Sequence, residues 1–154
     1  MNDPNILACK ESIDLLKQLA ASKAKVEFNQ GLDIRLMTAE KAELLRQIKC
    51  TDIHFAWDKY EDGNRIVPNL KEFKRLTGYS KHKVTVYCLC NYDTTFEQDL
   101  ERIYTIRDEV GFCPYVMLYQ KYNLKHGDPY FKLARWCNNK RILYTVKDFK
   151  DYKR

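Results

Sequence analysis

The sequence is short of the two residues that most often interrupt regular structure, with five glycines and four prolines among 154 residues. This shortage argues against a linker-rich or disordered chain, so we interpret residues 1–154 as a single domain large enough to bury a core. Long apolar runs are also missing, since no window approaches the roughly 18 apolar residues of a membrane span. The first residues show no basic stretch followed by an apolar core, so we expect a cytoplasmic protein without a secretory signal.

Motifs for phosphate binding, nucleophilic catalysis and metal binding are missing too. Neither G-x-G-x-x-G nor G-x-x-x-x-G-K-[ST] occurs, and no Ser-His-Asp arrangement is apparent. The six cysteines lack the paired spacing of zinc sites: four are isolated, and Cys88 and Cys90 lie two residues apart, on one face of a strand. We therefore expect reduced thiols, mostly in the core, and no metal site.

Positive charge is concentrated near the C-terminus. The chain has a formal net charge of +6, and residues 132–154 hold eight Lys/Arg against two Asp/Glu, a surplus equal to that of the whole chain. Such a basic region can meet nucleic acid or another acidic partner, while a solvated helix face at a chain end is the simpler interpretation. The eleven tyrosines add to this ambiguity, because Tyr-Lys interleaving resembles a base-stacking surface but no RNA-binding signature accompanies it.

Strand and helix patterns alternate along the chain. Strand patterns cover Val26–Gln30, Thr51–Asp58, Lys83–Cys90 and Cys113–Gln120. Helical patterns cover Asn5–Ala21, the residues after a Thr38 cap, Val67–Gly78, the residues after Thr94 and Thr95, and Asp128–Trp136, with a last short helix capped by Thr145. Strands that recur about every 30 residues between helices predict an α/β fold with a parallel sheet and right-handed crossovers.

Two overlapping capping boxes precede the helix that follows the third strand. Their spacing pairs Thr94 with Glu97 and Thr95 with Gln98, and Gly111 marks the predicted end of the helix.

Four parallel strands do not close a barrel, which normally takes about eight. The chain is therefore either a small open α/β sheet or part of a barrel, and in both cases ligands belong beyond the carboxyl ends of the strands. That rule selects the residues after each predicted strand: Gln30, Gly31, Asp33 and Arg35; Asp58, Lys59 and Tyr60; Asn91, Tyr92 and Asp93; and Tyr119, Gln120 and Lys121.

The second strand pattern is the most informative of the four. If Ile53, Phe55 and Trp57 face helices, His54 and Asp58 face the other side of the sheet. Asp58 is then either a ligand-binding carboxylate or a loop residue that pairs with a lysine. For His54 we expect the role of a hydrogen-bonded core histidine.

Four segments, taken in order, resemble the C-terminal part of a radical S-adenosylmethionine enzyme. They are DPNILACKESIDLLKQLAASKAKVEFNQGLDIRLMTAEKAELL, IHFAWD, VYCLCNYDTTFEQDLERI and PYVMLYQK. The resemblance runs from Asp3 to about Asn139, and its most specific pieces are FNQGLDIR and the D-T-T-x-E-x-D-L run that begins at Asp93. It implies a partial (β/α) barrel over residues 1–140, half of a TIM-like barrel, with a basic tail over residues 141–154.

The resemblance also implies S-adenosylmethionine as a cofactor. By position, Asn29, Gln30 and Arg35 would lie near its ribose and carboxylate, which amides and arginine can bind. Asp58 would end a strand near cofactor or substrate. The segment near the adenine would comprise Leu89, Cys90 and Asn91.

The [4Fe-4S] cluster of the family sits on a C-x3-C-x2-C motif that this chain lacks. We therefore expect the cluster only in a full-length form, and no radical activity from these 154 residues alone. The first hypothesis is a fragment that contributes cofactor- and substrate-contacting walls to an iron-sulfur radical enzyme. The alternative is a non-catalytic interaction module that self-associates or binds nucleic acid through its basic tail. Half a barrel would leave strand edges unpaired, so we expect pairing with the missing N-terminal half or self-association, and no membrane partner.

Overall fold

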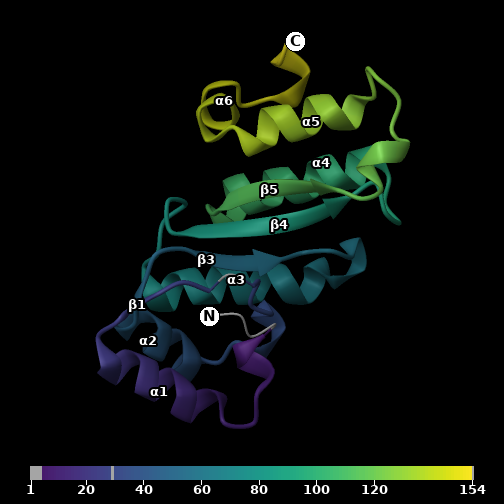
Figure 1. The fold of residues 1–154 in the computed structure, drawn as a ribbon. Coiled ribbons are helices and arrows are strands. Elements are labelled where there is room, and N and C mark those ends of the chain that lie inside the picture. The colour runs from purple at the N-terminus through teal and green to yellow at the C-terminus, as the bar shows by residue number, and fades with distance from the viewer. Residues whose placement is uncertain (1–4, 29, 154) are drawn as a thin grey trace.

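The chain folds into a parallel sheet flanked by helices. The computed structural model describes residues 5–28 and 30–153. The larger sheet has the order β3-β4-β5, and β4 runs parallel to both neighbours (Figure 1). Its strands are β3 (Ile53–Ala56), β4 (Val84–Cys90) and β5 (Cys113–Leu118). The predicted α/β class with parallel strands is therefore confirmed, and the strands of the described residues do not close into a barrel.

The first predicted strand, Val26–Gln30, is wrong in its extent. Of the described residues in this range, only Val26 belongs to a strand, β1 (Lys25–Val26), which pairs in parallel with β2 (Lys49–Cys50) in a separate small sheet. Contact with the larger sheet resumes at Leu32, which bridges Phe55 of β3. Val26 pairs with Cys50, and the next pairing joins Leu32 to Phe55. The chain advances six residues from Val26 to Leu32 but only five from Cys50 to Phe55, so one extra residue on the first segment interrupts the ladder.

The two faces of the larger sheet differ in their cover. Helices α3 (Gly63–Thr77) and α4 (Phe96–Tyr104) lie behind the strands in Figure 1, and no helix is drawn in front of them. The burial of β4 follows this arrangement, because Val84, Val86, Cys88 and Cys90 are fully buried while the residues between them are half-exposed. The sheet therefore has one packed face and one open face.

The remaining helices extend the molecule at its two ends (Figure 1). Helices α1 (Ser12–Ser22) and α2 (Ala39–Gln47) lie beside the small sheet, and α5 (Pro129–Asn138) and α6 (Lys140–Thr145) lie beyond β5. The short 3-10 helices are η1 (Ile6–Ala8), η2 (Ile34–Leu36), η3 (Tyr60–Asp62), η5 (Lys121–Asn123) and η6 (Phe149–Asp151). Among the helices of the described ranges, none has the length and apolar character needed to span a bilayer.

Helix α3 begins at Gly63, earlier than the predicted start at Val67. A Cβ at position 63 would collide with the indole ring of Trp57, so glycine lets the helix start directly against that ring. Pro68 consequently lies inside the helix and not in its first turn. The predicted end is confirmed: Gly78 adopts a left-handed conformation with φ of 69° and its N–H bonds to the carbonyl of Lys74 at 2.8 Å.

Helix α4 begins with one of the two predicted capping boxes. Thr95 accepts a hydrogen bond from the N–H of Gln98, whose side chain accepts one from the N–H of Thr95. The hydroxyl of Thr94 does not cap the helix, because it donates to Asp99 at 2.7 Å. Beyond Tyr104 the helix continues as a π-helix over Thr105–Val110, up to the predicted stop at Gly111.

The C-terminal residues pack onto the domain. Asp128 caps α5 as predicted, accepting a hydrogen bond from the N–H of Tyr130 at 2.9 Å. A last short helix does follow Thr145, the 3-10 helix η6, but its cap is Asp148, which accepts a hydrogen bond from the N–H of Lys150 at 3.1 Å, so the prediction of a Thr145 cap is wrong. Thr145 instead ends α6, whose cap is Asn139. Leu143 and Tyr152 are buried, which places residues of the basic segment 141–153 in the core.

Candidate functional site

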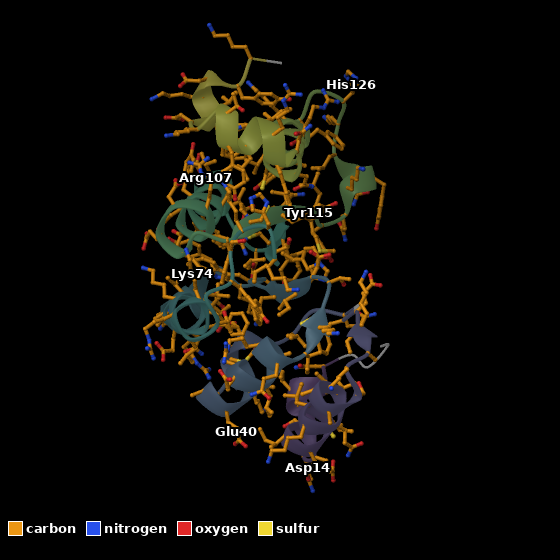
Figure 2. The ribbon with its side chains drawn as sticks, turned by 90° about the vertical axis from the view of Figure 1, so that its left-hand side faces the viewer. Asp14, Glu40, Lys74, Arg107, Tyr115 and His126 are labelled. Carbon is orange, nitrogen blue, oxygen red and sulfur yellow. The ribbon has the colours of Figure 1, made fainter. Side chains whose placement is uncertain are left out.

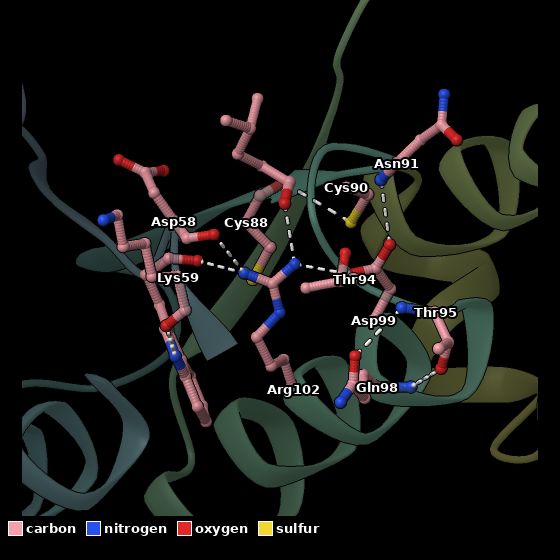
Figure 3. Close-up of polar contacts among 12 residues, drawn as sticks. Asp58, Lys59, Cys88, Cys90, Asn91, Thr94, Thr95, Gln98, Asp99 and Arg102 are labelled. Atoms are coloured by element: carbon pink, nitrogen blue, oxygen red, sulfur yellow. Dashed lines mark hydrogen bonds and ion pairs between the residues drawn. The ribbon is translucent and has the colours of Figure 1, made fainter. Parts of the chain in front are cut away.

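The carboxyl edge of the sheet is organised by one buried arginine, Arg102 of α4. Its Nη1 donates to the carbonyl oxygens of Trp57 at 2.6 Å and Asp58 at 3.0 Å, at the end of β3. Its Nη2 donates to the carbonyl of Leu89 at 2.6 Å, near the end of β4, and forms a salt bridge with Asp99 (Figure 3). One guanidinium therefore holds the ends of two adjacent strands at fixed positions.

Asp99 completes this arrangement from the same helix. It is fully buried, and its carboxylate accepts hydrogen bonds from the hydroxyl of Thr94 and, at 3.0 Å, from the N–H of Asn91 (Figure 3). The bond to Asn91 supports a left-handed backbone there, with φ of 62°. A buried ion pair is tolerated when further hydrogen bonds satisfy its charges, and these bonds do so for the Asp99 carboxylate and for both terminal nitrogens of Arg102, whereas its buried Nε has no partner among the described residues.

The sequence analysis did not select Arg102 and Asp99 as candidate site residues, although the pattern of the helix indicated that they lie beside its apolar stripe. They are three residues apart on the helix, next to Ile103 and Leu100 of its apolar stripe, so both had to face the core. The D-T-T-x-E-x-D-L run thus supplies a structural clamp in this fold, in addition to the cap of its helix.

A pocket of about 460 Å³ opens beyond the carboxyl end of β3. It is lined by Arg35 and Asp58, which the resemblance places near the cofactor, and by three more residues that follow the predicted strands, Gly31, Asp33 and Lys59. Its other charged residues are Glu61 and Asp62. With four carboxylates and two cationic side chains, the pocket has an excess of negative charge.

Arg35 is held in place by two of these carboxylates. Asp33 pairs with it through two bonds, from Nε at 2.9 Å and from Nη2 at 3.0 Å, and Asp62 accepts from Nη1 at 3.0 Å. Desolvation opposes ionisation of Asp33, but the hydrogen bonds from Arg35 outweigh it and hold the pKa of that carboxyl below its ordinary value. A ligand carboxylate would have to share or replace these partners.

Asp58 is the carboxylate best placed to meet a ligand. Its backbone carbonyl is fixed by Arg102, and its exposed side chain lines the pocket. Partial desolvation raises the pKa of the Asp58 carboxyl, while the positive charges of Arg102 and Arg35 limit the rise. The group combines a fixed backbone with a side chain that is open to the pocket.

The other residues selected from the sequence are more dispersed. Asn29 lies outside the described residues. Gln30 lines a neighbouring pocket on the open face of the sheet, which shares Gly31 with the first. Cys90 is fully buried and its thiol donates to the carbonyl of Cys88, so only its backbone can approach a ligand. Leu89 offers its carbonyl to Arg102, and the amide of Asn91 donates to the carbonyl of Tyr119 at 3.5 Å.

The pocket on the open face measures about 740 Å³ and is lined mainly by β-strand side chains. His54 stacks on Tyr87 with ring centroids 5.2 Å apart, and Tyr87 meets Tyr115 edge to face at 5.5 Å. The expected role of His54 as a hydrogen-bonded core residue is not observed: it is half-buried, and its Nδ1 has no partner within the described ranges. The alternation of the second strand pattern did place it on the correct face.

The residues present do not fit an iron-sulfur cluster. Five of the six cysteines are buried, and no group of three or more His, Cys, Asp or Glu among the described residues could hold a metal ion. Burial raises the pKa of the Cys88 thiol to about 12 and also raises that of Cys90, which favours the neutral thiol at both positions.

Comparison of the chain with protein-family models, curated proteins and solved structures gives no match in any of the three.

Proposed function

We propose that this chain forms the S-adenosylmethionine-contacting wall of a radical S-adenosylmethionine enzyme built on a partial (β/α) barrel. The main support is the charge of the carboxyl-edge pocket, which is lined by four carboxylates, Lys59 and Arg35, with Arg35 bonded to two of the carboxylates. S-adenosylmethionine has a sulfonium, an ammonium and a carboxylate, and therefore a net charge of +1. A negative pocket that contains a single fixed guanidinium is complementary to that pattern.

In this proposal each residue has a defined task. Asp58 and Glu61 bind the ammonium or sulfonium group, and Arg35, oriented by Asp33 and Asp62, binds the carboxylate. The shared Gly31 connects this pocket with the open face, over which the substrate lies. Because the cysteines do not fit a cluster, the [4Fe-4S] group and the electron it supplies come from a segment or partner that carries C-x3-C-x2-C, and no radical step is assigned to these residues.

The test is calorimetric titration of the chain with S-adenosylmethionine and with S-adenosylhomocysteine, which lacks the sulfonium charge. We expect weak binding that favours S-adenosylmethionine. Asp58→Asn removes one charged contact and should weaken binding about tenfold. Asp14→Asn on α1, at the far end of the molecule in Figure 2, makes the same chemical change outside the pocket and should leave binding unchanged.

Two results would count against the proposal. One is the absence of a heat signal at millimolar ligand, and the other is equal affinity for the two ligands, which would remove the charge argument.

A further inference from the structure

The open face continues across β5 into a second groove. A pocket of about 960 Å³ lies between β5 and α5, and it shares Tyr115, Met117 and Asn138 with the pocket on the open face. Tyr115 and Met117 are 41% and 48% exposed, which is unusual for large apolar side chains in the middle of a strand. Figure 2 shows Tyr115 on the side away from Lys74 and Arg107, which belong to the helical layer. The two pockets therefore form one aromatic groove over β4 and β5.

Cationic side chains lie along this groove. Lys121, Lys132 and Arg135 line its β5–α5 part and Lys140 lines its open-face part, against the two acids Asp128 and Asp52. None of the four cations forms a salt bridge within the described ranges. Lys132 lies over the rings of Phe149 and Tyr152, and Arg135 and Lys140 are exposed. The groove thus combines the exposed ring of Tyr115 and the half-buried ring of Tyr87 with a surplus of positive charge, four cations against two acids.

We propose that this groove binds single-stranded nucleic acid, with bases stacked on Tyr115 and Tyr87 and the phosphates near Arg135, Lys132 and Lys140. Aromatic platforms beside a basic track are the general means of binding single strands, because every base has a π-face and every nucleotide a negative charge. A duplex would leave the rings unused, since its bases are already stacked on one another.

A second copy of the chain fits this groove less well. A symmetric dimer through this face would place two surfaces together that each hold four cations against two acids, so their net charges repel. The edge of β5 is also closed to strand addition at Val116, whose N–H and carbonyl both bind the side chain of Asn138. Charge complementarity therefore favours a polyanion. The groove includes the open face over which the proposed substrate lies, but none of its rings or cations lines the cofactor pocket, so oligonucleotide binding can be measured separately from S-adenosylmethionine binding.

The test is fluorescence anisotropy with labelled oligothymidylate and oligouridylate of about 12 nucleotides, within the range that one such surface covers. We expect binding that weakens steeply as salt is raised. Tyr115→Ala should weaken it about tenfold, and Tyr122→Ala is the matched control, since Tyr122 is 85% exposed and lies outside both pockets.

A second matched pair tests the charges. Arg135→Glu should weaken binding at low salt and reduce its salt dependence, whereas Lys10→Glu, the same kind of charge reversal at an exposed position near α1, should have a markedly smaller effect. Circular dichroism of each variant establishes that it is folded.

Three results would overturn the proposal. The first is no binding at about 100 μM protein in low salt, where even non-specific binders are saturated or nearly so. The second is an equal loss in each variant and its control. The third is a dimer in light scattering that Tyr115→Ala dissociates while oligonucleotides do not bind, which would identify a second copy as the occupant.

Discussion

The side-chain amide of Asn138 forms two hydrogen bonds with the backbone of Val116. Its Oδ1 accepts from the N–H of Val116 at 2.7 Å, and its Nδ2 donates to the carbonyl of Val116 at 3.0 Å. The amide therefore takes the place that a residue of a further strand would occupy. Pro114, two residues earlier on β5, has no N–H to offer, so the outer edge of the sheet is protected at two successive positions.

Replacing Asn138 should expose that edge. We expect Asn138→Leu to lower the free energy of unfolding by about 1–3 kcal/mol, because two partly buried backbone groups lose their partners. We also expect concentration-dependent association, since an unpaired strand edge accepts other strands. Urea titration and light scattering measure the two effects. Asn123→Ala, which removes only an exposed side-chain bond to Gln120, is the control, and an Asn138 variant as monomeric and stable as this control would refute the edge-protecting role.

Replacing Arg102 should cost far more stability than replacing a surface arginine. Arg102→Met leaves the Asp99 carboxylate buried without its cation and three backbone carbonyls without a donor, so we expect a loss of about 3–5 kcal/mol in urea unfolding. Arg75→Met breaks an exposed pair with Glu72 and should cost less than about 1 kcal/mol.

The double variant Arg102→Met, Asp99→Leu removes both buried charges, so it separates the cost of an unpaired buried charge from the cost of lost packing. It should lose less stability than the two single variants together, because no buried charge remains unpaired. Strict additivity of the three measurements would mean that the two residues act separately.

The pairing of Asp33 with Arg35 should make stability depend on pH in the acid range. The folded chain holds the pKa of Asp33 below its unfolded value of about 3.9, so ionised Asp33 stabilises the fold above that pH. This contribution is lost as pH falls through the folded pKa. Asp33→Asn should therefore lower stability at pH 7 and reduce the loss that the chain shows below about pH 4.

The matched comparison for this experiment is Asp14→Asn, which removes an exposed carboxylate that forms no salt bridge within the described residues. Thermal unfolding followed from pH 7 to about pH 3 provides the measurement. Parallel pH profiles of wild-type and Asp33→Asn chains would exclude a stabilising ion pair at Arg35.

The periodic parts of the fold could be predicted from the sequence. The patterns located β3, β4 and β5 to within a few residues, and capping chemistry located the starts of α4 and α5, because each signal depends on residues close in sequence. The first strand was overextended because the extra residue before Leu32 is defined only against its partner strand. The start of α3 was missed because it depends on how Gly63 meets Trp57.

In the candidate site too, features that depend on the strand pattern could be predicted, and features that depend on tertiary contacts could not. The rule that ligands lie beyond the carboxyl ends of parallel strands selected five residues that line one pocket: Gly31, Asp33, Arg35, Asp58 and Lys59. It could not show that Arg35 is already bound by Asp62, which lies 27 residues away. Nor could it show that Asn138 would cover the edge of β5, since both depend on tertiary contacts.

The Arg102 guanidinium also couples the position of the loop after β3 to that of the loop after β4. It bonds to the carbonyl of Asp58 on one loop and, through Asp99, holds the N–H of Asn91 on the other. Both residues on α4 are buried, so neither loop can shift without moving the helix or breaking a charged hydrogen bond. A ligand that displaces the backbone of Asp58 must therefore either break a charged hydrogen bond or move α4 and, with it, the loop that contains Asn91.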